Sequence, residues 1–226
     1  THFSDVMGLP APNLYTSARD LAVLARHVVL DYPEYYHFFK VKYITYNGIK
    51  QPNFNKLLFI DQYADGLKTG STEAAGYSLI GSEKRPNNRR LISVVIGSNN
   101  SLQSAYDSSA LLKYGDQFFT TETFYKAEEK VASSHVYMGE ENTVNLGTAN
   151  IVSLTFPKSL HKKDFTFTIK QNTPYQAPIK KGQVLGELQI SYQGKIIEKT
   201  PLTALSEIPK GSLWQRIKGK VSLWLA

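Results

Sequence analysis

The hydrophobic pattern of this chain changes near Phe118, and that change constrains the fold more than any other feature. Before it, apolar residues recur at helical spacing in some segments and alternate in others. Between residues 130 and 205 the helical spacing disappears, and short alternating runs are separated by Gly, Pro and Asn. Such runs are typical of a small all-β sandwich or barrel. The sequence therefore predicts an α+β region over residues 1–118 and an all-β domain over residues 119–206.

The α+β region is expected to begin with a helix over residues 16–31. Ser17 and Asp20 have the spacing of an N-terminal capping box, and Pro33 lies just beyond the helix. One apolar face is predicted at helical spacing, formed by Leu21, Leu24, Ala25, Val28 and Val29. The runs KYITYNGI and KLLFI, which follow, are interpreted as β-type segments.

Three consecutive antiparallel strands are predicted between residues 66 and 97, because two β-rich runs are joined there by the turn signal RPNN. A helix over residues 102–114 follows, and it is expected to pack through Ala105, Ala110, Leu111 and Leu112. The basic stretch EKRPNNRR, residues 83–90, is interpreted as a solvated hairpin tip. No interleaved aromatic residues support stacking on bases, so nucleic acid is not expected as a partner.

Composition limits the kinds of function. The chain has 226 residues, of which 42% are hydrophobic, so a sizeable core is expected. A formal net charge of +7 suggests an anionic partner, namely nucleic acid, an acidic membrane or a negatively charged polymer, without choosing among them. There is no cysteine, which excludes disulfides and thiolate metal sites. The five histidines lack metal-ligand spacing, so neither a metal nor a cofactor is expected.

The last segment, residues 207–226, is predicted to form an amphipathic helix. One arc of its helical wheel is apolar and contains Leu213, Trp214, Ile217, Val221, Trp224 and Leu225. Three cations flank that arc, namely Arg216, Lys218 and Lys220, while Gln215, Gly219 and Ser222 lie opposite. Two tryptophans and three cations on one short helix favour an interfacial membrane anchor. The alternative is a terminal helix docked on its own core.

The stretch DGLKTGST, residues 65–72, contains a candidate binding edge. On a strand, Lys68 and Gly70 point to one side and Thr69 to the other. Backbone N–H groups from Thr69 to Ser71 would line the strand edge, and Gly70 would let a ligand backbone approach closely. Such an edge suits a ligand with an extended backbone and a carboxylate. An ordinary exposed lysine at a strand start is the alternative, because Lys-Thr-Gly alone is a weak signal.

The longer stretch DGLKTGSTEAAGYSLIGS resembles the third motif of the penicillin-recognising serine enzymes. More closely, it resembles the low-molecular-mass D-alanyl-D-alanine carboxypeptidases of the penicillin-binding protein 5 and 6 type. Further segments are similar to the same family, namely THFSDVMGLPAP, TSARDLAVLARHVV, PEYYHFF, YNGIKQPNFNKLL and RRLISVVIGS. The resemblance implies the C-terminal part of a transpeptidase-like domain (an antiparallel sheet with helices), then an all-β sandwich domain and a terminal amphipathic helix.

The resemblance also implies roles for the binding edge. Lys68 and Thr69 would bind the terminal carboxylate of a D-Ala-D-Ala stem peptide of peptidoglycan, beside Gly70. The N–H of Ser71 would be one donor of the oxyanion hole. The implied reaction removes the terminal D-alanine through an acyl-enzyme, and β-lactam antibiotics would react at the same site. The implied location is the periplasmic face of the bacterial inner membrane, held peripherally on its anionic surface.

The chain departs from the family pattern in several places. The family carries a Ser-x-x-Lys nucleophile motif and a Ser-x-Asn motif upstream of Lys-Thr-Gly. This chain, which begins THFS, starts after both, so it is expected to be processed or truncated and inactive alone. SLHK, Ser159 to Lys162, fits the first motif by letter but is interpreted as a solvated loop of the β domain. SNN at Ser98 fits the second motif in the wrong order.

Two departures concern binding. Close relatives often have His where this chain has Ser71, and they can carry Arg in the loop where residues 98–104 have no cation. Carboxylate binding would then rest more heavily on Lys68. Two other functions stay open: a non-catalytic membrane-surface binding module derived from this family, and a β-lactamase, which shares Lys-Thr-Gly. The β domain and the terminal helix argue against a β-lactamase.

Overall fold

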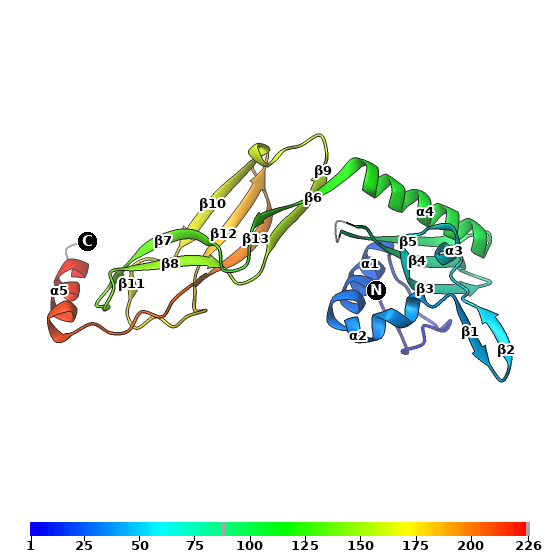
Figure 1. The fold of residues 1–226 in the computed structure, drawn as a ribbon, viewed down its shortest axis with the longest axis horizontal. Coiled ribbons are helices and arrows are strands. Elements are labelled where there is room, and N and C mark those ends of the chain that lie inside the picture. Colours follow the sequence, from blue (N-terminus) through cyan, green and yellow to red (C-terminus); the bar gives the residue numbers. More distant parts are fainter. Residues whose placement is uncertain (87–88, 225–226) are drawn as a thin grey trace. The chain divides into compact units, whose positions relative to one another are not determined.

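A computed structural model describes residues 1–86 and 89–224 of the chain. The chain divides into two compact units, Thr1–Phe119 and Thr120–Ala226. Figure 1 shows helices around a small sheet in the first unit, and strands followed by one helix in the second. The predicted fold class, an α+β region followed by an all-β domain and a terminal helix, is confirmed.

The first unit is built on the three antiparallel strands that the sequence predicted. These are β3 (Ala64–Thr72), β4 (Gly76–Lys84) and β5 (Arg90–Ser98), in the order β3-β4-β5. Leu79 packs with residues of α4 (Ser101–Phe118), whereas Ile80 packs in a cluster with α1 (Ala18–Asp31). Because neighbouring strand residues point to opposite faces, these two helices cover opposite faces of the sheet.

Helix α1 begins as its capping signal predicts. The Ser17 hydroxyl accepts a hydrogen bond from the Asp20 backbone N–H at 3.1 Å. Short elements follow it, namely α2 (Pro33–Tyr36) and η1 (His37–Lys40). The predicted apolar face is wrong at Leu24, which is exposed, whereas the neighbouring Ala25 is buried. The smaller side chain lets the helix approach the sheet closely.

One segment differs in type from the sequence prediction. The run KYITYNGI forms a hairpin of β1 (Tyr43–Tyr46) and β2 (Ile49–Pro52), but KLLFI forms the short helix α3 (Leu57–Ile60) rather than a strand. Leu57 and Leu58 are both buried, which a half-buried strand could not achieve with adjacent residues. The predicted packing of α4 is also wrong at Leu111 and Ala110, which are exposed. Small residues take their place in the interface, namely Ser104, Ala105, Ser108 and Ser109, together with Leu112.

The interpretation of residues 83–90 as a solvated hairpin tip is wrong for the arginines that the structure describes. Arg85 pairs with the buried Glu83 at 2.8 Å, Arg89 with Asp116 at 3.4 Å, and Arg90 with Asp65 at 2.7 Å. These ion pairs therefore hold the three arginine side chains against the first unit. Asn87 and Asn88, the last two residues of the RPNN turn signal, lie outside the described residues.

The second unit has one large sheet and one two-stranded sheet. The large sheet has the order β10-β12-β13-β8-β7-β11, and the small one pairs β6 with β9. The strands are β6 (Phe119–Tyr125), β7 (Lys130–Tyr137), β8 (Thr143–Thr148), β9 (Val152–Pro157), β10 (Phe165–Gln171), β11 (Tyr175–Gln176), β12 (Val184–Tyr192) and β13 (Lys195–Ala204). A single core of sixteen buried side chains lies among them. The short helix η2 (Lys162–Asp164) precedes β10, and α5 (Leu213–Trp224) ends the unit.

Candidate peptide-binding edge and terminal helix

The Lys-Thr-Gly stretch lies on an edge strand. Within the described residues, β3 pairs with β4 and with no other strand. Along this strand Lys68, Gly70 and Ser71 are exposed, and Thr69 is half-buried. The Lys68 ammonium donates a hydrogen bond to the carbonyl of Thr69. An edge strand presents unpaired backbone groups along its free side, which an extended peptide can use as an additional strand.

A polar network holds the start of β3. The register of β3 against β4 shifts between Ala64 and Gly66, and Asp65 lies at that irregularity. Both carboxylate oxygens of Asp65 accept from the Arg90 guanidinium, at 2.8 and 2.7 Å. The fork geometry of such a pair fixes orientation as well as charge. Asp65 precedes Lys68 by three residues, so the network fixes the strand just before the candidate binding residues.

Tyr36 completes this network from α2. Its hydroxyl donates to Asp65 at 3.0 Å and accepts from Arg90 at 3.1 Å. Burial raises the pKa of Tyr36 to about 12, so the hydroxyl stays protonated at neutral pH. A Cβ at Gly66 would lie only 2.6 Å from the Tyr36 hydroxyl oxygen, so glycine is required for this close approach.

A cavity of about 540 Å³ opens beside the candidate edge. Three consecutive residues of β3 line it, together with Phe54, Lys56, Tyr77, Ser78, Ser101 and Ser104. This is a suitable volume for part of a peptide. Sequence patterns did not indicate Phe54 or Lys56 as site residues, because Phe54 lies in the loop before the run KLLFI, and Lys56 begins that run, which was interpreted as a strand. The alternation of Asn53 and Asn55 around Phe54 was the available signal for a structured turn.

The two other serine motifs lie in a turn and at the end of a strand. Ser159 lies in an exposed turn of the second unit, and the Lys162 ammonium donates to the carbonyl of Phe124 at 3.3 Å. Ser98 ends β5, and its hydroxyl donates to Asp107 at 3.1 Å. Among the described residues, no group of three or more His, Asp or Glu side chains could hold a metal ion.

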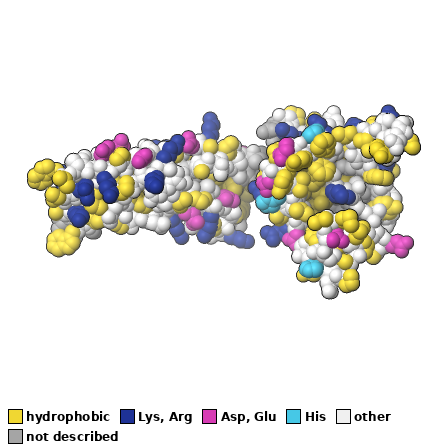
Figure 2. Space-filling view, turned by 90° about the horizontal axis from the view of Figure 1, so that it is seen from below, with side chains coloured by type: hydrophobic (Ala, Val, Ile, Leu, Met, Phe, Trp, Pro, Cys, Tyr) yellow, Lys and Arg dark blue, Asp and Glu magenta, His cyan; other side chains and the backbone are white. Residues whose placement is uncertain are grey.

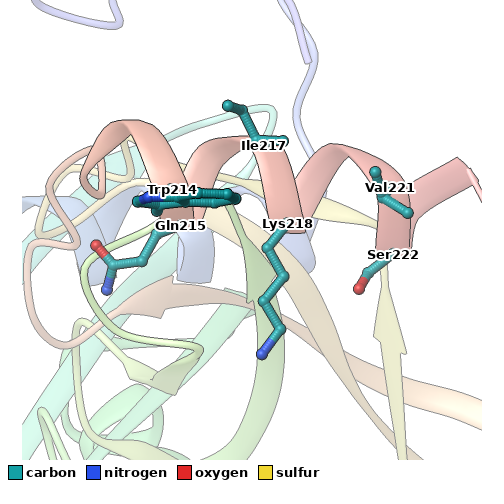
Figure 3. Close-up of a pocket in the computed structure, with 6 residues that line it drawn as sticks. All are labelled: Trp214, Gln215, Ile217, Lys218, Val221 and Ser222. Atoms are coloured by element: carbon teal, nitrogen blue, oxygen red, sulfur yellow. The ribbon is translucent and has the colours of Figure 1, made fainter.

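The terminal helix α5 lies on the second unit with its polar side. Gly219 packs so closely against β7 and the residue after it that an added Cβ would lie 2.7 Å from the Met138 nitrogen. The Gln215 side-chain amide donates to the carbonyl of Glu140 at 3.3 Å. Figure 3 shows Gln215, Lys218 and Ser222 on the side that faces the strands, and Ile217 pointing away from them.

The apolar arc of α5 is consequently exposed. Trp214 and Trp224 are 80% and 86% exposed, and Ile217 and Val221 are more than half exposed. Figure 2 shows hydrophobic side chains with lysine or arginine at the end of the second unit where α5 lies. Arg216 and Lys220 are exposed as well. Leu225, which the sequence places on the same arc, lies outside the described residues.

Helix length gives a separate finding. Within residues 1–86 and 89–224, no helix is both long and apolar enough to cross a membrane.

Comparison with known proteins identifies two consecutive segments. Residues 1–100 match the family described as D-alanyl-D-alanine carboxypeptidase, and residues 119–210 match the penicillin-binding protein 5, C-terminal domain. The chain is 38% identical over 221 residues to D-alanyl-D-alanine carboxypeptidase DacC of Escherichia coli (strain K12), covering 96% of this chain and 54% of that protein. DacA of the same strain is 37% identical over 224 residues, with 99% and 55% covered.

A solved structure supports the same relationship. The crystal structure of penicillin binding protein 5 from Haemophilus influenzae matches with a TM-score of 0.81 and 36% identity, covering 93% of this chain and 61% of that one. The chain spans about half the length of the curated relatives it matches. Both consecutive matches and the structural match agree on one identification. The chain belongs to the D-alanyl-D-alanine carboxypeptidase family, in the group of penicillin-binding protein 5 and its relatives.

Proposed function

We propose that this chain forms part of a serine-type D-alanyl-D-alanine carboxypeptidase that trims peptidoglycan stem peptides. In this proposal, residues 1–118 are the C-terminal part of the catalytic domain, residues 119–206 are the β domain, and residues 207–226 anchor the protein to the membrane. The family relationship supports the reaction class. The serine nucleophile would come from a part of the protein other than these 226 residues. β-Lactam antibiotics would acylate the same site.

The observation that carries the proposal is the exposed Lys-Thr-Gly stretch on the free edge of β3. A stem peptide would add to this edge as an extended strand. Lys68 and Thr69 would bind its carboxylate through charge-assisted and neutral hydrogen bonds. The Ser71 N–H would stabilise the oxyanion that develops when the serine attacks the peptide carbonyl.

Replacing the lysine tests this role. In the protein that carries the nucleophile segment, we expect Lys68→Ala to slow acylation by a fluorescent penicillin by about 10- to 150-fold. That range corresponds to losing a hydrogen bond to a charged group, about 1.5–3 kcal/mol. Because Lys68 is exposed, the variant should remain folded, which circular dichroism would verify. Lys84→Ala, at the exposed end of β4, is the matched control and should react normally. Normal acylation of folded Lys68→Ala would refute the assignment.

We further propose that α5 holds the protein on the periplasmic face of the inner membrane. The exposed arc of Trp214, Ile217, Val221 and Trp224 would enter the lipid interface. Arg216 and Lys220 would contact anionic headgroups, and Lys218 would reach them from the side that faces the strands. The docking of α5 through Gly219 supports this orientation, because it leaves the apolar arc unoccupied by the unit itself.

Vesicle sedimentation tests the anchor. Vesicles containing anionic lipid should sediment the chain, and neutral vesicles should sediment less of it. The double variant Trp214→Ala/Trp224→Ala should lose most of this binding. Ile169→Ala, which removes an exposed apolar side chain of β10 in the same unit, should bind like the unmodified chain. Equal binding by the tryptophan variant would mean that α5 is only a packed terminus.

A further inference from the structure

The cavity beside the candidate edge has a distinctive charge. Its walls contain three β3 residues (Thr69, Gly70 and Ser71), the aromatic rings of Phe54 and Tyr77, and serine hydroxyls. Lys56 is the one charged residue among those that line it. Residues 98–104, which run from the end of β5 into the first turn of α4, contain no lysine or arginine. The cavity therefore combines one positive charge with hydroxyl groups and apolar contact area, a combination suited to an anionic peptide.

The backbone of Lys56 is held rigidly. On one side the buried Asn55 accepts a hydrogen bond from the Leu57 N–H at 3.1 Å, and its own N–H donates to Asn53 at 2.9 Å. On the other side, Leu57 is fully buried in the cluster that contains Leu79 and Ala105. A half-buried lysine between such fixed neighbours loses little further backbone freedom when it binds.

The Lys56 ammonium is also available. Across the described residues, its nitrogen takes part in no ion pair and no hydrogen bond, whereas Lys68 already donates to the Thr69 carbonyl. A cation without a partner, in a cavity lined by hydroxyl groups and by the strand edge, favours a negatively charged group on a ligand that lies along that edge.

We propose that Lys56 is a second cation of the binding site and pairs with a carboxylate of the peptide that lies on β3. This inference rests on the proposed function, because it takes the ligand to be a stem peptide. The carboxylate belongs either to the C-terminus of the peptide or to one of its side chains. Lys56 thereby sets a preference for anionic over neutral peptides.

The experiment measures binding and turnover separately, in the protein that carries the nucleophile segment. The probes are a fluorescent peptide ending in D-Ala-D-Ala with both kinds of carboxylate, the same peptide with a C-terminal amide, and the same peptide with its side-chain carboxylate amidated. Fluorescence anisotropy gives Kd, and released D-alanine gives kcat/KM. The variants are Lys56→Met, which keeps most of the side-chain volume, Lys56→Arg, which keeps the charge, and the control Lys84→Met.

We expect Lys56→Met to weaken binding of the full peptide about tenfold, and Lys56→Arg and Lys84→Met to bind it normally. If amidating one of the two carboxylates makes Lys56→Met and the unmodified protein bind equally well, that carboxylate is the partner of Lys56. Equal weakening of all three peptides, or none, would overturn the inference. If the protein releases D-alanine but neither Kd nor kcat/KM depends on Lys56, the inference about Lys56 is wrong and the proposed function stands. If binding depends on Lys56 but no D-alanine is released, the inference about Lys56 is supported and the proposed carboxypeptidase reaction is refuted. Failure of the unmodified protein to bind any of the peptides would refute both.

Discussion

The two units of this chain bury their apolar side chains in different ways. The second unit gathers sixteen buried side chains into one core, whereas the first has one buried cluster of four residues and another of three. Most of the large apolar side chains that are exposed among the described residues belong to the first unit, for example Phe38, Tyr46 and Phe54. The candidate peptide-binding edge lies in the less well-packed unit.

This difference indicates how each unit obtains its stability. A contiguous core is what a domain needs to fold independently. Large exposed apolar surfaces mark contacts with other protein or with ligands. We infer that the second unit is stable by itself, and that the first unit depends on further surface to cover its apolar side chains. Five of the ten large apolar side chains that are exposed among the described residues of the second unit lie on α5, and the proposed membrane contact accounts for these five.

The largest expected effect comes from separating the units. A fragment of residues 120–226 should unfold cooperatively, whereas a fragment of residues 1–119 should bind a hydrophobic dye strongly and show no cooperative transition. Thermal unfolding followed by circular dichroism, together with dye fluorescence, measures both. A cooperative transition in the first fragment without dye binding would contradict the comparison.

Truncating the core of the second unit gives the next largest effect. Leu188 on β12 is fully buried, so Leu188→Ala should lower the free energy of unfolding of this unit by about 2–5 kcal/mol. Ile169→Ala, at an exposed position of the neighbouring strand β10, should cost less than about 1 kcal/mol. Hydrogen exchange of the β12 amides reports the difference. Similar losses in both variants would show that the core does not hold the unit together.

Breaking the network at the start of β3 should have an intermediate effect. Arg90→Met leaves the Asp65 carboxylate, which is 18% exposed, without its guanidinium partner. In the protein that carries the nucleophile segment, we expect the free energy of unfolding of the first unit to fall by about 1–3 kcal/mol, measured by hydrogen exchange of the β3 and β4 amides. The control Lys181→Met removes an exposed ion pair with Glu128 in the second unit and should cost at most about 1 kcal/mol. Equal losses of stability in Arg90→Met and Lys181→Met would mean that the network is no stronger than an exposed ion pair.

The smallest expected effect is a pH dependence confined to the first unit. Below pH 10, Tyr36 is protonated in both the folded and the unfolded chain, so its titration leaves stability unchanged. Between pH 10 and about 12, the unfolded chain releases the phenolic proton while the folded unit retains it, so the free energy of unfolding falls as pH rises. Tyr36→Phe should lose this part of the slope. An identical slope in Tyr36→Phe, measured by hydrogen exchange of β3 amides, would exclude this residue as its source.

Much of this architecture could be predicted from local sequence patterns. The three strands between residues 66 and 97 and the all-β region follow from alternation and turn signals, which depend only on near neighbours. The interpretation of KLLFI as a β-type segment was wrong, because its four apolar residues fit a buried strand and a buried helix equally well. Burial of both Leu57 and Leu58, the former in a cluster with the distant Leu79, decides it in favour of a helix.

The parts of the site that escaped prediction depend on contacts between distant residues. Arg90 follows Asp65 by 25 residues, and only the pairing of β3, β4 and β5 brings them together. Lys56 precedes the Lys-Thr-Gly stretch by more than ten residues, and no sequence motif connects it with the cavity. For α5 the arc was predictable from the helical wheel, but the docking of Gly219 on Met138 required the tertiary structure.

The central claim is that an extended ligand binds on the free edge of β3 and that the second unit takes no part in the reaction. Hydrogen exchange of the protein that carries the nucleophile segment, compared before and after acylation by penicillin, tests this most directly. We predict slower exchange of the amides from Thr69 to Ser71 and unchanged exchange throughout residues 120–224. Slower exchange only in the second unit, or a penicillin label that maps to Ser159, would contradict the account.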